Sequence, residues 1–507
     1  MKNKLFYGLT LALASASVFG LAACGGKTTT TTNNDGSTTT QNAGVCGGAT
    51  DLVADVTNLL PKRQVIKLYT DNGEGYSEEI VTAFEKAYPQ YILEVETVGA
   101  TDVRARMELE GADGADVFVF PHDHVGAALS SGLLAKAPTA VADKFDETLK
   151  ASTLDTIKSC WDDATGKQKQ CTGNDVKYTF GAPLSAESNA LFYNIELVKE
   201  ILTDFAATLE GDAKTKYEGI ANQLNGTNLA QLMTLEDVME VSAFYNVVPS
   251  AGNTDHQYFY QADFDNFYHS YMYLTPFGFE LFGPNGDDKT ADNLGSDAVI
   301  DALDYVKETF RVGAATPIYP LAIADVVEGT YMDEFYAGTA PIVVTGPWNA
   351  STIYEAFAVE GEEGLTYPNL GGCEMFPITV NGVKTPSTTF SGVQVIGVSS
   401  LSKVTSAAWD LVQYMVSDEG ASILYSNSGK LPCLKDTSNI EGISEDIVLN
   451  AVSAQLLNSK GMPSINEMGY VWTIGENLFK EAFQGLDSAE VAAKAHKSFV
   501  DQAGLTE

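Results

Sequence analysis

The chain has 507 residues, 45% of them hydrophobic and 10% aromatic, which is enough to form a large core divided between two lobes. Its formal net charge of -37 excludes nucleic acid as a partner and opposes binding to anionic lipid, and we interpret it mainly as a source of solubility. Five histidines and no metal-type cysteine spacing argue against a zinc site, and we expect no metal and no other cofactor.

The first residues resemble an export signal. Lys2 and Lys4 precede an apolar run at residues 5–23, which ends in the order Leu-Ala-Ala just before Cys24. This ending is similar to a bacterial lipobox, in which the cysteine thiol receives a diacylglycerol. We therefore expect residues 1–23 to be a signal peptide and Cys24 to be lipidated. The alternative is a membrane-spanning anchor, but the apolar run is marginal in length for a span.

Residues 24–50 are rich in Thr, Asn, Ser and Gly, without apolar periodicity. Such a composition predicts a flexible tether between a membrane anchor and a folded body. We expect the protein at the cell membrane, held by lipid on the extracellular or periplasmic face.

Six cysteines are present, and five remain if Cys24 is lipidated. Cys160 and Cys171 flank a turn-like segment at residues 162–167, so a disulfide across a hairpin is the first pairing expected in an oxidising compartment. Cys373 with Cys433 is a second pairing, which leaves Cys46. The alternative for all of them is burial as free thiols.

Strands and helices alternate in the first part of the body. The hydrophobic pattern predicts strands at residues 64–70, 91–98 and 116–120, and helices at residues 76–88, 102–110 and 124–131. This order predicts an α/β fold with a mostly parallel sheet covered on both faces. Ligands of such sheets bind beyond the carboxyl ends of strands, so residues 71–74 and 120–124 are candidate ligand loops.

The hydrophobic pattern predicts further strands and helices up to the last residues, and we expect a second lobe to begin near residue 196. We expect strands at 178–182, 190–193, 341–345 and 393–398, and helices within 196–246 and at 296–310, 326–336, 403–416, 470–483 and 488–503.

Several segments match one family in order and at sensible spacing. They are DVFVFPHDH at residues 116–124 followed by SGLLA at 131–135, APLSAE at 182–187 followed by YN at 193–194, GPW at 346–348, SDEG at 417–420, and MP at 462–463 followed by Met468 and Trp472. With these motifs the chain, over most of residues 64–503, resembles the maltose/maltodextrin-binding proteins and the wider family-1 extracellular solute-binding proteins.

The resemblance implies an α/β, two-lobed periplasmic-binding-protein-like fold with a hinge between the lobes and a ligand in the cleft. Lobe one would contain residues 51–186 plus 393–440, and lobe two residues 187–392 plus 441–507. The chain would cross between the lobes near Glu187, Thr389 and Ile440.

The resemblance also places the ligand site. A saccharide needs aromatic faces for its apolar side and side chains that accept hydrogen bonds from its hydroxyl groups. The aromatic positions of the family fall on Phe120, Phe267, Trp348 and Trp472. The polar positions fall on Asp71, Asn72, Glu74, Asp123, His124, Glu187 and Asp265.

Structural roles compete with these assignments. Asp123 has the position of a helix N-cap, and Trp348 follows Gly-Pro at a turn where tryptophans often only pack. Glu187 lies where the chain would cross between lobes. In the alternative role, its carboxylate would form a structural hydrogen bond there instead of binding the ligand. Asp265 and Phe267 depend on an alignment through a variable segment.

The sequence departs from the maltose binders at three positively charged positions. Glu74 stands in place of a lysine, and His124 and Glu476 stand in place of arginines. A charged hydrogen bond contributes about 1.5 to 3 kcal/mol when it is desolvated, so the ligand of this chain is expected to differ in detail from maltose. A neutral oligosaccharide still fits, and a cationic or amino-bearing solute stays open.

The resemblance implies a receptor without catalytic activity. It would be a monomer that captures a small carbohydrate and delivers it to the permease subunits of an ABC transporter. The alternatives are the same fold with a polyamine or iron as ligand, a glycoside hydrolase that uses Asp123 and Glu187 as its two carboxylates, or an adhesive surface lipoprotein.

Overall fold

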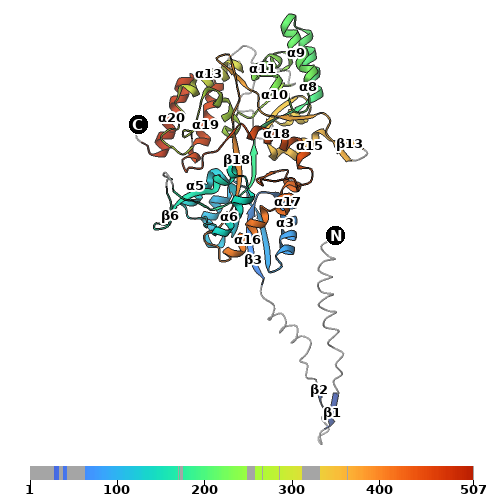
Figure 1. Cartoon of the computed structure of the whole chain (residues 1–507), viewed down its shortest axis with the longest axis vertical. Coiled ribbons are helices and arrows are strands. Elements are labelled where there is room, and N and C mark those ends of the chain that lie inside the picture. Colours follow the sequence, from blue (N-terminus) through green and yellow to red (C-terminus); the bar gives the residue numbers. More distant parts are fainter. Residues whose placement is uncertain are drawn as a thin grey trace. The chain divides into compact units, whose positions relative to one another are not determined.

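The computed structural model (Figure 1) describes residues 28–32, 38–42, 63–169, 171, 175–247, 257–264, 266–284, 286–310, 332–361 and 364–505. Contacts divide the chain into two units, Met1–Gln64 and Val65–Glu507. Within the described residues, no helix has both the length and the apolar character that crossing a membrane requires.

Among the described residues of the first unit, β1 (Thr28–Thr32) runs antiparallel to β2 (Thr38–Asn42). The pair differs from the expectation of a tether without regular structure. The signal segment, the rest of residues 24–50, Cys24 and Cys46 lie outside the described residues, so the tether and the lipidation stay predictions.

The larger sheet of the second unit has seven strands in the order β19-β9-β18-β5-β3-β4, and β20 also pairs with β18. It begins with the predicted order strand, helix, strand at β3, α3 (Gly73–Ala87) and β4, and β3 and β5 are parallel neighbours. The bounds of its strands are β3 (Gln64–Thr70), β4 (Tyr91–Thr97), β5 (Val117–Pro121), β9 (Gly181–Ser188), β18 (Thr389–Val398), β19 (Leu431–Pro432) and β20 (Ser459–Gly461).

The prediction of a mostly parallel sheet was wrong. β18 runs antiparallel to both of its long neighbours, β5 and β9, and β9 runs antiparallel to β19. A parallel neighbour needs a long crossover, usually a helix, between the two strands. In contrast, β9 and β18 are entered directly from other strands, β8 (Lys177–Thr179) and β17 (Val383–Thr385).

Amphipathic helices cover this sheet. α3 (Gly73–Ala87) buries Tyr76, Ile80 and Phe84, which are spaced four residues apart and therefore share one helical face. Other helices that contribute to the same core include α4 (Val103–Glu110), α5 (Val125–Ser130), α6 (Thr139–Thr148), α7 (Ala151–Leu154), α16 (Thr405–Met415) and α17 (Asp418–Ser428). Figure 1 shows α3, α16 and α17 beside β3.

A smaller sheet with the order β11-β12-β10-β15 organises the other half of the unit. Its strands are β10 (Ala190–Asn194), β11 (Tyr260–Gln261), β12 (Ile342–Thr345) and β15 (Leu370–Cys373). β12 and β15 both run antiparallel to β10, whereas β11 is parallel to β12.

Helices again surround the smaller sheet, including α8 (Ile195–Ala207), α9 (Gly211–Gln223), α10 (Leu229–Leu232), α11 (Leu235–Tyr245), α13 (Asp297–Thr309), α15 (Ala350–Phe357), α18 (Ile447–Leu456), α19 (Met468–Phe483) and α20 (Ser488–Ala503). Of the helix expected at residues 326–336, the described part contains α14 (Asp333–Tyr336), and residues 326–331 lie outside it.

The chain passes directly from the larger to the smaller sheet between β9 and β10, which only Asn189 separates. Oγ of Ser188 donates to the carbonyl oxygen of Phe390 at 2.8 Å and lies 2.7 Å from Oγ1 of Thr389. These bonds join the end of β9 to the start of β18. The lobe boundaries at residues 186–187, 392–393 and 440–441 stay predictions.

The cysteines follow the sequence expectation in part. A disulfide joins Cys160 to Cys171, with an S–S distance of 2.09 Å, next to the small sheet of β6 (Lys158–Asp162), β7 (Lys167–Gln168) and β8. The second suggested pairing is wrong, because Cys373 and Cys433 are free buried thiols. They belong to two different hydrophobic cores, so no bond joins them.

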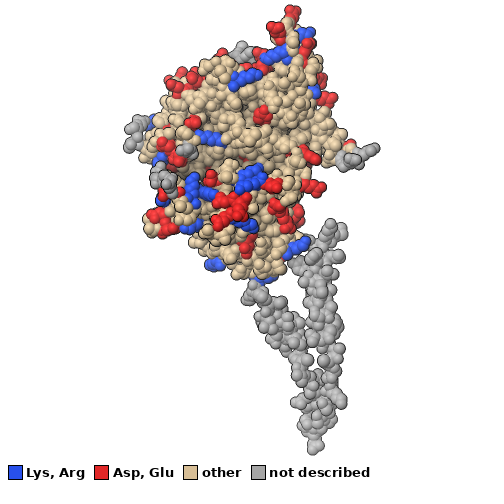
Figure 2. Space-filling view, in the orientation of Figure 1, with Lys and Arg blue, Asp and Glu red and all other residues tan. Residues whose placement is uncertain are grey.

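The charge of the second unit is distributed. Figure 2 shows Asp and Glu side chains over many parts of the visible face, with Lys and Arg side chains and wide uncharged areas between them. This face therefore carries no single acidic surface that would account for the net charge.

We predict that the Cys171→Ser variant lowers the free energy of unfolding by up to about 3 kcal/mol, because the disulfide no longer restricts the unfolded chain. Urea unfolding with and without a reductant checks this. The reductant should destabilise the original protein and leave Cys171→Ser unchanged. Equal stability of the two proteins under oxidising conditions would contradict it.

Candidate functional site

A lysine holds the loop that follows β3. Nζ of Lys430 donates to Asn72 Oδ1 at 2.6 Å and to Asp71 Oδ1 at 3.3 Å. It also donates to Gln394 Oε1 at 2.8 Å, and Nε2 of Gln394 donates to Asp71 Oδ2 at 2.9 Å. The Lys430 side chain is only 12% exposed. One cation, one carboxylate and two amides thus form a closed network that fixes the loop.

Lys430 was not among the residues predicted from the sequence. α17 ends at Ser428, and Gly429 with φ 62° reverses the chain so that Lys430 leads into β19. The Gly-Lys-Leu-Pro run after a helix was the available signal. It predicts the turn, but the partners of the lysine come from residues 71–72 and 394, which only the folded sheet brings together.

Glu187 lies near the end of β9, opposite Gly392 of β18. A Cβ atom at position 392 would come within 2.8 Å of the Glu187 side chain, so the glycine leaves room for the carboxylate. Burial raises the pKa of Glu187 above its usual value, and Asp71 and Asp123 raise it further, while Lys430 acts in the opposite direction. Glu187 therefore shares one electrostatic environment with the Asp71 loop and with Asp123.

Asp123 and His124 lie in the 3-10 turn His122–His124 that follows β5. No side-chain hydrogen bond caps this turn or α5, so the N-cap interpretation of Asp123 was wrong. Asp123 is 9% exposed, and its Oδ1 atom is buried without a hydrogen-bond partner in the described structure, as is Nδ1 of His124. Both groups keep an unused hydrogen-bonding atom.

His122, the neighbour of Asp123, has a structural role. Its Nδ1 accepts a hydrogen bond from the backbone N–H of Val393 at 3.0 Å, so the proton is on Nε2, which donates to the carbonyl oxygen of Met462 at 3.0 Å. Burial lowers the pKa of His122 below its usual value. A neutral imidazole therefore joins β18 of the larger sheet to the segment that precedes α19.

Trp348 presents an aromatic face. It lies in the 3-10 turn Pro347–Asn349 that follows β12, and it is 38% exposed, an unusual state for a tryptophan. Its indole covers Gly346, where a Cβ atom would come within 2.2 Å of the ring. The ring centroids of Tyr268 and His269 lie 6.0 and 5.6 Å away. Trp348 is therefore positioned by its neighbours but keeps free surface.

The structure does not expose Phe267 to a ligand, and the next residue is the one that contacts Glu187. Phe267 is buried against Gly475 of α19, in the core of the smaller sheet. The next residue, Tyr268 of α12 (Phe267–Ser270), donates from its hydroxyl to the backbone oxygen of Glu187 at 3.4 Å. Burial raises the pKa of Tyr268 well above its usual value, so this hydroxyl keeps its proton.

Trp472 belongs to the same group of rings. It is partly buried on α19, and its ring centroid lies 6.1 Å from that of Phe390 on β18. Phe390 in turn stacks with Tyr268 at 6.2 Å. A continuous series of ring contacts thus connects Trp472 to Trp348.

Phe120, Glu74 and Asp265 were also predicted to bind the ligand. Phe120 is fully buried in the core of the larger sheet, stacked on Phe118, and offers no face to a ligand. Glu74 is exposed in the first turn of α3, where a carboxylate stabilises the helix dipole. Asp265 lies outside the described residues.

The two halves of the second unit contribute different side chains to the region around the contact of Tyr268 with Glu187, which we call the junction. Asp71, Asn72, Asp123 and Glu187 come from the larger sheet, whereas Tyr268, Trp348 and Trp472 come from elements around the smaller sheet. Carboxylates and amides can bind hydroxyl or amino groups, and aromatic rings can cover a flat apolar surface. The arrangement therefore suits a polar ligand with apolar faces. No cluster able to hold a metal ion occurs among the described residues.

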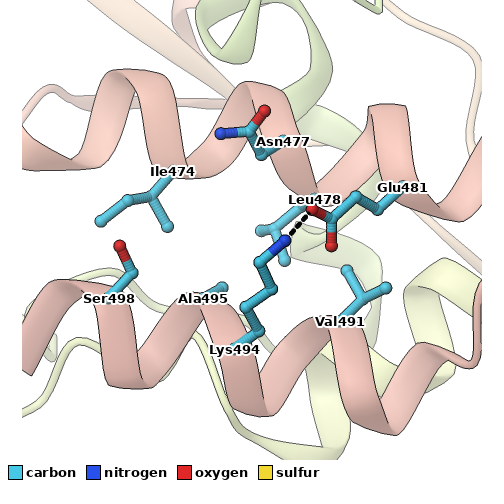
Figure 3. A pocket seen from close by; sticks show the side chains of 8 residues that line it. All are labelled: Ile474, Asn477, Leu478, Glu481, Val491, Lys494, Ala495 and Ser498. Carbon is cyan, nitrogen blue, oxygen red and sulfur yellow. Dashed lines mark hydrogen bonds and ion pairs between the residues drawn. The ribbon is translucent and has the colours of Figure 1, made fainter.

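A separate pocket lies between α19 and α20 (Figure 3). Its wall includes Ile474, Leu478 and Val491, and an ion pair between Lys494 and Glu481 spans it. None of the predicted ligand residues lines this pocket.

Several known proteins are similar to this chain in sequence. Residues 79–450 match the family model described as bacterial extracellular solute-binding protein. The maltooligosaccharide ABC transporter solute-binding lipoprotein of Streptococcus pneumoniae R6 is 26% identical over 455 residues, which cover 88% of this chain and 90% of the relative. The galactooligosaccharide-binding protein of Bacillus subtilis is 24% identical and covers 82% of this chain and 85% of its own.

The fold has solved counterparts. The crystal structure of MalX from Streptococcus pneumoniae in complex with maltopentaose superposes with a TM-score of 0.64 at 22% identity. The superposition covers 86% of this chain and 100% of that one. It shows that the α/β fold of the second unit is of the periplasmic-binding-protein type, as expected from the sequence.

We predict that Phe267→Ala lowers the free energy of unfolding by about 3 to 5 kcal/mol, because it opens a cavity in the core. Trp348→Ala should cost on the order of 1 kcal/mol, since that ring is already partly exposed. Chemical denaturation of the two variants checks the difference. Similar losses would show that Trp348 is a core residue.

We also predict that stability falls as the pH decreases from 7 to 5. The pKa of His122 is lower in the folded than in the unfolded protein, so the unfolded chain binds its proton first and is favoured in acid. Urea unfolding at both pH values should show a smaller loss for His122→Gln than for the original protein. An equal loss in the two proteins would contradict the prediction.

Proposed function

Because the chain belongs to the bacterial extracellular solute-binding proteins, we propose that it is the substrate-binding protein of an ABC importer and that it captures an oligosaccharide. The observation that supports this best is that aromatic rings from one half and carboxylates from the other meet at the junction. Exposed Trp348 and partly buried Trp472 belong to one half, and the carboxylates of Asp71, Asp123 and Glu187 belong to the other.

A saccharide matches both sets of groups. Its hydroxyl groups donate to carboxylates, and the C–H face of a pyranose packs on an indole ring. The relatives named for maltooligosaccharide and galactooligosaccharide binding support this ligand class. In the proposed mechanism the sugar binds between the halves, where Tyr268 contacts Glu187, and favours their closed arrangement.

The proposal includes attachment and delivery. Cys24 would carry the lipid, residues 24–50 would form the tether, and the closed protein would be recognised by permease subunits in the membrane. The lipoprotein names of the relatives support the anchor. Two acyl chains or more hold a soluble domain at a membrane stably, since each buried methylene contributes about 0.8 kcal/mol.

We propose a receptor that does not hydrolyse its ligand. The membership in a solute-binding family supports this conclusion.

Calorimetric titration of the purified protein with maltotriose, maltopentaose and a galactooligosaccharide tests the proposal. We expect saturable binding of at least one of them, a smaller radius of gyration by X-ray scattering when it is bound, and no release of reducing sugar. Trp348→Ala should weaken binding at least about tenfold, which corresponds to the loss of a stacked aromatic contact.

Phe244→Ala is the matched control for the tryptophan variant. Phe244 is an exposed aromatic residue of α11 that belongs to none of the site contacts, so its removal should leave the affinity unchanged. Absence of heat and of compaction with all three saccharides would reject an oligosaccharide ligand. Hydrolysis of a bound saccharide that is lost in Glu187→Gln would instead establish an enzyme.

A further inference from the structure

Asp123 is a buried carboxylate with an unsatisfied oxygen. The residue is 9% exposed, and its Oδ1 atom has no hydrogen-bond partner in the described structure. A buried carboxylate without a partner is costly unless another group supplies a hydrogen bond or a positive charge. Asp123 interacts electrostatically with Glu187 and Tyr268, so it faces the junction that contains the proposed ligand site.

The lysine of the site does not meet this need. An ammonium group has three hydrogen-bond donors, and those of Lys430 are directed to Asp71, Asn72 and Gln394. Its charge is therefore paired with Asp71. Within the described residues, no lysine or arginine forms an ion pair with Asp123 or Glu187.

The histidines beside Asp123 do not replace the missing cation. His122 is neutral, because its Nδ1 accepts a backbone hydrogen bond and burial lowers its pKa. His124 keeps an unpartnered Nδ1 and makes no ion pair in the described structure. The polar side of the junction thus has three carboxylates, those of Asp71, Asp123 and Glu187, and one paired lysine.

We propose that the site prefers a saccharide that carries an ammonium group, and that this ammonium binds to Oδ1 of Asp123 on the side that faces Glu187. The inference rests on the proposed function and adds the chemical class of the substrate, an amino sugar within an oligosaccharide. A hydroxyl group supplies one hydrogen bond to Asp123 but brings no positive charge to the neighbouring carboxylates of Asp123 and Glu187. An ammonium supplies the bond and the charge together, and charge-assisted hydrogen bonds are roughly twice as strong as neutral ones.

A series of amino-deoxy maltotrioses tests the inference. Each probe has one hydroxyl replaced by an amine, and the position of the amine changes along the series, with maltotriose and the N-acetylated probes as neutral references. At pH 7 we expect at least one amine to bind at least about tenfold more tightly than maltotriose. Its N-acetylated form should lose the gain.

Two variants assign the effect to the site. Asp123→Asn keeps the shape and one acceptor oxygen but removes the charge, so it should abolish the preference for the amine. Glu360→Gln removes the same charge from the exposed strand β13 (Val359–Gly361) and should keep the preference. Equal loss in both variants would mean that the acidic surface attracts cations in general, and it would overturn the inference.

The outcomes separate the inference from the proposed function. If maltotriose binds and no amine binds more tightly, the oligosaccharide function stands and the amine preference is rejected. If no saccharide of either kind binds, both proposals fail.

Discussion

Backbone hydrogen bonding between β9 and β18 positions nearly every part of the site. The pairing sets Glu187 opposite Gly392, and the room left by that glycine accommodates the carboxylate. β9 continues through Asn189 into the smaller sheet, while β18 carries Phe390 toward the rings of Tyr268 and Trp472. One strand pair therefore determines how the acidic and aromatic sides of the junction meet.

Charge burial is the second constraint at the junction. Carboxylates close to one another in a partly dry environment raise each other's pKa, as Glu187 shows. Lys430 acts in the opposite direction on Glu187, but its hydrogen-bond donors are all engaged by Asp71, Asn72 and Gln394. The same network that makes the loop rigid thus leaves Asp123 available to a ligand.

Local sequence patterns predicted the helices and strands well, but they did not predict the contacts between segments that are distant in the sequence. The helical spacing of Tyr76, Ile80 and Phe84 is visible in the sequence, and α3 follows from it. In contrast, the direction of β18 depends on where the chain re-enters the sheet. The choice between Phe267 and Tyr268 depends on which ring meets Gly475, a residue more than 200 positions away.

The two free thiols in the described part of the chain have a practical consequence. Cys373 and Cys433 lie in the separate cores of the two halves, and burial raises the pKa of each to about 12. Thiol reagents attack the accessible thiolate, so each cysteine becomes labelled only when its own core opens. Labelling rates at the two positions therefore report the fluctuations of each half independently, without an introduced cysteine.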